Sequence, residues 1–172
     1  PGSILRWIFD RLRFQEDTGQ QECERIGADL ASAVSITSMH EIANIRLSAK
    51  ITDLDLIYSN APSSESHQPK NKKLEIQFLG FGAGHYLIAI AAEVFSEYSI
   101  WVRSHYPSLR FLAVGCANGM IGYLPTASAL TEGGYEPERS LRMFGQPRPL
   151  AKKFEREVYT TLTDMIEFME AN

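Results

Sequence analysis

Hydrophobic positions follow a helical period at the two ends of the chain. Between residue 20 and about residue 39 the apolar residues recur at mostly helical intervals, and Asp17 or Thr18 upstream offers an N-cap. This spacing predicts an amphipathic helix. A second helix is predicted at the end of the chain by an apolar stripe that consists of Phe154, Val158, Leu162, Met165, Ile166 and Met169.

Strand-like patterns fill the middle of the chain. Residues 42–58 alternate in part between apolar and polar positions, which favours a half-buried strand. Leu74 to Phe78 alternates, three glycines follow, and residues 85–92 form a nearly continuous apolar run, so we expect a hairpin whose second strand is buried on both faces. An apolar stripe over residues 94–102 predicts a helix, and residues 109–116 predict another buried strand.

Two segments lack a regular period. Residues 59–73 are polar and hold two prolines, which predicts a flexible loop. Residues 117–136 are rich in Gly and hold two Tyr and a Pro, so we expect a structured loop that is too irregular for a simple element. The chain is thus predicted to form one α/β domain over residues 1–172, with a mixed sheet and a hairpin flanked by amphipathic helices.

Composition narrows the classes of function. The chain has 172 residues, of which 44% are hydrophobic and 22% charged, as in a folded globular protein. Its net charge of -4 provides no positive field for phosphate backbones, so nucleic-acid binding is disfavoured. The longest apolar runs are far shorter than a bilayer requires, and no signal-peptide core is visible. The sequence does not determine the cellular compartment.

The usual catalytic and metal-binding motifs are missing from the sequence. The four histidines, His40, His67, His85 and His105, have no metal-binding spacing, and no Gly-x-Ser-x-Gly elbow occurs. The glycines at 80, 82 and 84 are followed by a strand and lack the Lys-Ser/Thr of a phosphate loop, so they indicate a turn. Cys23 and Cys116 are far apart and could form at most one disulfide.

Glu93 and the Gly-rich loop are the candidates for a site. Glu93 follows a predicted strand and precedes a predicted helix, where α/β proteins place ligands and acid or base groups. The alternative is a helix N-terminal acid that interacts only with the helix dipole. In the loop, several glycines surround Tyr123 and Tyr135, as expected where polar side chains are held next to a ligand, although a purely structural loop would look alike.

Three motifs resemble the neutral/alkaline, non-lysosomal ceramidase family and its bacterial relatives. They are AEVFSEY at 92–98, ANGMIGYLPT at 117–126 and EGGYE at 132–136, and the upstream helix ECERIGADLASAV at 22–34 is also similar. The resemblance covers the second half of the family's conserved domain. It implies a zinc amidase that cleaves the N-acyl bond of a lipid-like or small amide substrate, as in sphingolipid metabolism.

The resemblance also implies a set of site residues. Carried over by motif, Glu93 is a zinc ligand and Tyr123 a second one, with supporting loop residues at Asn118, Thr126, Tyr135 and Glu136. The two histidine ligands and the serine nucleophile belong to the half that precedes residue 22, so this chain holds no catalytic nucleophile. The sequence has Ala91-Ala92 where the family usually has Pro-Gly, and 30 residues separate the two ligands, fewer than in the true ceramidases.

These departures lead to three hypotheses. The first is that the chain, which opens Pro1-Gly2-Ser3, is part of a larger zinc-dependent amidase and is inactive without the missing N-terminal half, because two ligands are too few for zinc. The second is a non-catalytic binding or assembly module that keeps the fold. The third is association into a homo-oligomer through apolar surface.

Overall fold

The structure is a computed structural model that describes residues 19–37, 45–59 and 72–171. Its contacts divide the chain into two units, Pro1–Ala43 and Asn44–Asn172. The predicted N-cap at Asp17 or Thr18, the end of the first helix beyond residue 37, and nearly all of the predicted loop at 59–73 lie outside the described residues. Within those residues, no helix is long and apolar enough to cross a membrane.

The first unit contributes one described helix, α2 (Gly19–Ile36), which confirms the predicted helix. Arg25 donates to Glu22 and to Asp29 at 2.6 and 2.7 Å, one turn away on either side. Leu30, Val34 and Ile36 on this helix are exposed.

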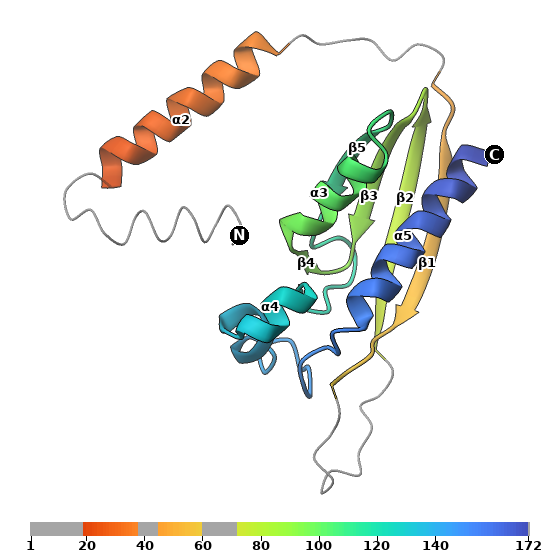
Figure 1. Cartoon of the computed structure of the whole chain (residues 1–172). Helices are drawn as coiled ribbons and strands as arrows, with labels where there is room; N and C mark the ends of the chain where they lie inside the picture. Colours follow the sequence, from red (N-terminus) through yellow and green to blue (C-terminus); the bar gives the residue numbers. More distant parts are fainter. Residues whose placement is uncertain (1–18, 38–44, 60–71, 172) are drawn as a thin grey trace, which may run out of the picture. The chain divides into compact units, whose positions relative to one another are not determined.

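The second unit is built on a four-stranded mixed sheet in the order β1-β2-β3-β5 (Figure 1). Strands β1, β2 and β3 are antiparallel neighbours, and β3 pairs with β5 in parallel. The predicted hairpin is therefore present as β2 and β3, and the predicted mixed α/β fold is confirmed. The strands span Ser48–Asp55 (β1), Lys73–Gly82 (β2), His85–Ile90 (β3) and Arg110–Val114 (β5).

One face of this sheet is covered by two helices, α3 (Ser96–His105) and α5 (Phe154–Ala171). All six predicted apolar positions of α5 are buried, and Tyr98 and Val102 are the buried residues of α3. The inner residues of β2, Leu74, Ile76 and Phe78, are fully buried against them. A Cβ at Gly80 would lie 3.0 Å from the terminal methyl of Met169, so the end of α5 packs against bare strand backbone.

The opposite face of the sheet corrects two expectations from the sequence. Strand β5 was expected to be buried, but Arg110, Leu112 and Val114 are exposed because β5 is an edge strand whose outer face has no covering layer among the described residues. In β3 only Ile88, Ala89 and Ile90 are buried, whereas His85, Tyr86 and Leu87 are partly buried. The apolar run therefore predicted that a strand forms, but not whether another layer packs on each of its faces.

The Gly-rich segment contains more regular structure than expected. After β5 the chain forms β6 (Tyr123–Leu124), helix α4 (Ala127–Glu132) and one π-helical turn, η1 (Tyr135–Arg139). Strand β4 (Glu93–Val94) pairs with β6 in a separate two-stranded sheet. A bridge between Tyr58 and Leu150 then joins the segment before α5 to the residues that follow β1.

Alkaline pH should destabilise this unit through Tyr98. Its ring is buried, its hydroxyl donates to the Pro125 carbonyl at 3.1 Å, and burial raises its pKa well above the ordinary value. In the unfolded chain tyrosine ionises near pH ~10. Stability should therefore be unaffected by this group below pH ~10 and fall as the pH rises further, because the unfolded state releases a proton that the folded state keeps.

Urea denaturation between pH 9 and 11 measures this effect. The Tyr98→Phe variant should lose about 1 kcal/mol at neutral pH with its hydrogen bond, and should show a shallower alkaline decline. An unchanged decline in the variant would contradict the assignment. Tyr106→Phe is the matched control, because that ring is only partly buried, against Trp101 and Phe111, and its removal should leave the decline as it is.

Candidate functional site

The structure brings Glu93 and Tyr123 together as register partners. Strands β4 and β6 run parallel, with Glu93 opposite Tyr123 and Val94 opposite Leu124. The Glu93 amide donates to the Gly122 carbonyl at 2.8 Å, which fixes the register at this point. The two residues that the resemblance assigns to one metal therefore lie side by side, although 30 positions separate them in the sequence.

The residues just before Glu93 are held from both sides. Ala91 and Ala92 are buried; the Cys116 amide donates to the Ala92 carbonyl at 2.8 Å and the Ile121 amide to the Ala91 carbonyl at 2.9 Å. Gly115 allows its segment to lie close to the Ala92 carbonyl, because a Cβ at position 115 would lie 3.0 Å from the Ala92 oxygen. Ala-Ala thus fits where the family usually has Pro-Gly, and Glu93 still faces Tyr123.

The side chains of this pair interact directly. The Tyr123 hydroxyl donates a hydrogen bond to the Glu93 carboxylate. Burial raises the pKa of Tyr123 to about 12, assisted by that hydrogen bond, by the Glu93 charge, and by the nearby Tyr135 and Glu136. At neutral pH the phenol is therefore protonated.

Two aromatic rings fix the orientation of Tyr123. Tyr135 meets it edge to face at 6.1 Å between centroids, and Phe144 does the same at 6.0 Å. Gly122 precedes the tyrosine with φ of 112°, and a Cβ there would lie 2.9 Å from Cγ of Phe144. A side chain at position 122 is thus excluded both by the backbone conformation and by the Phe144 ring.

Long-range hydrogen bonds hold the loop residues on both sides of Tyr123 and Phe144. Gln146 donates to the Ile121 carbonyl and accepts from the Tyr58 hydroxyl. Lys72 donates to the Phe144 carbonyl at 2.8 Å and to that of Gly145 at 3.2 Å. These supporting residues were missed from the sequence, because single polar residues between irregular segments carry no periodic signal.

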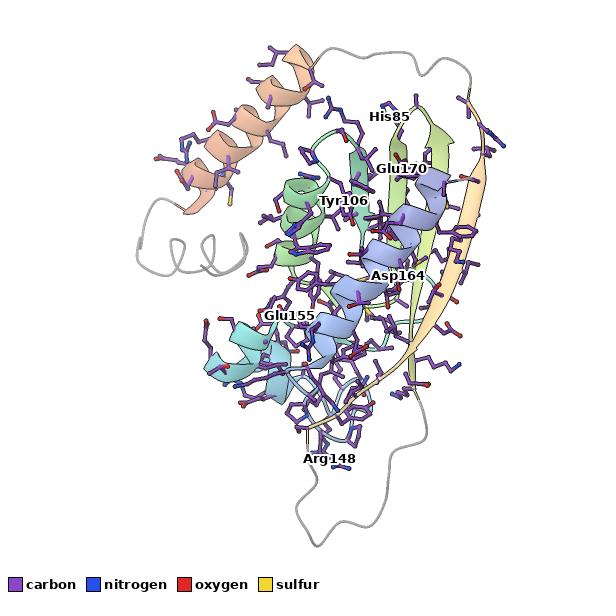
Figure 2. All side chains as sticks on the ribbon, turned by 45° about the vertical axis from the view of Figure 1, so that its right-hand side comes forward. His85, Tyr106, Arg148, Glu155, Asp164 and Glu170 are labelled. Carbon is purple, nitrogen blue, oxygen red and sulfur yellow. The ribbon has the colours of Figure 1, made fainter. Side chains whose placement is uncertain are left out.

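A small cavity adjoins Tyr123 on the side of η1. Its polar lining includes Glu136, Gln146 and Arg148, and the Arg148 guanidinium also donates to the Ser59 carbonyl at 3.4 Å. Figure 2 shows Arg148 at the end of the unit away from His85 and Glu170. The cavity is lined by Gly122, Tyr123, Pro125, Glu136, Pro137, Ser140, Leu141, Phe144, Gln146, Arg148 and Leu150.

The other two predicted loop residues have structural partners. Thr126 caps α4, because its hydroxyl oxygen accepts from the Ala129 amide at 3.2 Å. Asn118, at a φ of 56°, donates from its side-chain amide to the Glu75 carboxylate on β2 at 2.6 Å. Tyr135 and Glu136 are thus the supporting residues that lie with Glu93 and Tyr123, whereas Asn118 and Thr126 shape the loop.

The candidate ligands do not form a complete metal-binding group among the described residues. No group of three or more His, Cys, Asp and Glu that could hold a metal occurs among residues 19–37, 45–59 and 72–171. His40 and His67 lie outside these ranges, His105 stacks on Trp101, and His85 begins β3 at the end opposite Glu93. Glu93 and Tyr123 offer two adjacent oxygen donors, which fits half of a zinc shell.

Comparison of the chain with known protein families, with curated proteins and with solved structures finds no match.

The Gly122→Ala substitution should disturb the site. The left-handed backbone and the Phe144 ring both oppose a Cβ, so we expect the free energy of unfolding to fall by about 1–3 kcal/mol. Gly119→Ala, in the same loop, is the matched control because a Cβ there meets nothing within 4 Å. That variant should change stability by less than about 0.5 kcal/mol in urea denaturation. Equal effects of the two substitutions would contradict the packing described for Gly122.

Proposed function

We propose that this chain is part of a ceramidase-like, zinc-dependent amide hydrolase that cleaves an N-acyl bond. The observation that carries the proposal is the pairing of Glu93 with Tyr123, because two residues chosen by motif alone prove to be register partners whose side chains are hydrogen-bonded. Nothing in the pattern of apolar residues requires a carboxylate and a phenol to meet there. A loop with a purely structural role would not require a carboxylate and a phenol at these two positions.

In this proposal Glu93 and Tyr123 supply two of the zinc ligands. A bound zinc ion would polarise the amide carbonyl or activate water. Glu93 brings a negative charge that offsets the cation, and Tyr123 brings a phenolic oxygen next to that carboxylate. Tyr135 and Glu136 border the same position.

In this proposal the remaining ligands and the nucleophile lie in the half of the family's domain that the resemblance places before residue 22. Zinc needs three or four protein ligands, and the histidines among the described residues do not lie with Glu93. The substrate is an N-acylated lipid-like molecule or a small amide; the resemblance favours the first because ceramide is the family's substrate.

A second candidate function is a non-catalytic binding or assembly module. Two observations favour it. The chain has Ala91-Ala92 where the family usually has Pro-Gly, and the structure packs both alanines without leaving Glu93 in strained backbone. The Tyr123 hydrogen bond to Glu93 would then serve only to hold β4 against β6.

The isolated chain should neither bind zinc stoichiometrically nor hydrolyse N-acyl substrates. The reason is that its two oxygen ligands leave the zinc shell half filled. Metal analysis after dialysis against zinc, together with an N-acyl hydrolysis assay on the same sample, measures both properties. Stoichiometric zinc with turnover would show that the ligand set is complete within this chain, contrary to the proposal.

In the native protein that contains this sequence, Tyr123→Phe should lower both zinc content and amidase activity. Loss of one ligand typically weakens metal affinity by about tenfold or more. Tyr106→Phe is the matched control, since Tyr106 packs against Trp101 and Phe111, away from the site, and should preserve both. Unchanged metal and activity in Tyr123→Phe would favour the non-catalytic module.

A further inference from the structure

Among the described residues, the face of the four-stranded sheet opposite α3 and α5 has no covering layer and is mostly apolar. Residues that share this face alternate with the buried residues under α3 and α5, and they line up in two rows. One row consists of Ala49, Leu79, Leu87 and Leu112, and the other of Ile51, Gln77, Ala89 and Val114. We call these eight residues, with Leu47 directly before β1, the open face.

The open face presents more apolar surface than a sheet exposed to water ordinarily does. Leu47, Ile51 and Leu112 are 75%, 60% and 59% exposed. With Leu79 and Val114 they leave roughly 500 Å² of mostly apolar side chain in contact with solvent, near the upper range for a whole monomer. A standard interface buries ~800 Å² on each partner, somewhat over half of it apolar, so this face has the area that such an interface needs.

Charges of opposite sign lie at opposite corners of the open face. Arg110 begins β5, opposite His85 on β3, and Figure 2 shows His85 at that end of the hairpin. Asp53 lies on β1, the other edge strand, opposite Glu75 on β2 and therefore at the other end of the sheet. The Asp53 carboxylate has only a long contact of 3.8 Å with Lys73, and both side chains are about half exposed.

We propose that the open face binds a second copy of this chain in a symmetric, sheet-on-sheet dimer. A two-fold axis that lies between the two sheets brings the open face of one copy against the open face of the other. If the axis also exchanges the basic and the acidic corner, each Arg110 lies next to Asp53 of the other copy. The strands of the two sheets then cross at a large angle, as in orthogonal sheet packing. The apolar rows form the centre of the interface and the two charge pairs lie at its rim.

The charge pattern of the open face favours a second copy of this chain as its binding partner. A face with basic and acidic corners on one diagonal is complementary to its own copy, because the symmetry pairs each corner with its opposite. A partner of one sign would match one corner and be repelled by the other. The proposal stands independently of the proposed amidase function, because none of its residues belongs to the Glu93–Tyr123 site.

Sedimentation velocity of the full chain between about 1 and 100 µM tests the dimer. We expect a concentration-dependent dimer that Leu112→Glu weakens by about tenfold or more, because it buries an unpaired charge. Ile100→Glu is the matched control, since Ile100 is 60% exposed on α3, off the open face, and should leave the dimer intact. Circular dichroism of each variant checks that the fold is kept.

A charge exchange tests the orientation of the two copies. Arg110→Asp and Asp53→Arg should each weaken the dimer by a few-fold, and the double variant should recover most of the affinity. A monomer at every concentration would overturn the proposal, and so would equal effects of Leu112→Glu and Ile100→Glu. A dimer lost in Leu30→Glu but kept in Leu112→Glu would assign the association to α2 instead and would equally overturn it.

Discussion

The backbone hydrogen bonds along residues 90–95 are the constraint on which the candidate site depends. This short stretch leaves the sheet at the end of β3 and is bonded on one side by residues 116 and 117 and on the other by residues 121 to 124. Two parts of the segment that follows β5 thus bond to one segment that precedes α3. Because both parts bond to the same segment, the carboxylate of Glu93 and the phenol of Tyr123 cannot be placed independently of each other.

Burial and electrostatics then determine the state of that pair. A phenol in a partly desolvated position beside a carboxylate retains its proton, and the raised pKa of Tyr123 reports this arrangement. The surrounding rings of Tyr135 and Phe144 leave the phenol little freedom to turn away. A cation at this position would favour release of the phenolic proton, so metal binding and proton release would be coupled.

The local elements were largely predictable from the sequence, whereas their cover and support were not. Helices α2 and α5 follow from apolar positions at helical spacing, and the β2–β3 hairpin follows from alternation interrupted by glycines. Such patterns record which residues avoid water, but not which layer excludes it. The strand around Leu112 was therefore expected to be buried, although the structure leaves it exposed.

The candidate site divides in the same way. Glu93 could be singled out by its place between a predicted strand and a predicted helix, and Tyr123 by its Gly-rich loop, whereas naming them as a pair rested on the resemblance of the motifs around them. Gln146, Tyr58 and Lys72 could not, since they act through long-range hydrogen bonds that have no local signature. Thr126 and Asn118 belong to the same loop, but their side chains serve the helix cap and the contact with β2.

The β4–β6 pairing also bears on how such a chain can change in evolution. Residues 95–122 connect β4 to β6 and include α3 and β5. Because β4 and β6 pair with each other, the two ends of this connection are fixed. Additions or deletions at its far turn, around Pro107 and Ser108, change the length of the connection but not the register of its ends. Loop length carries only a small entropic cost, so a spacing of 30 residues is one of many that would present the same two side chains to each other.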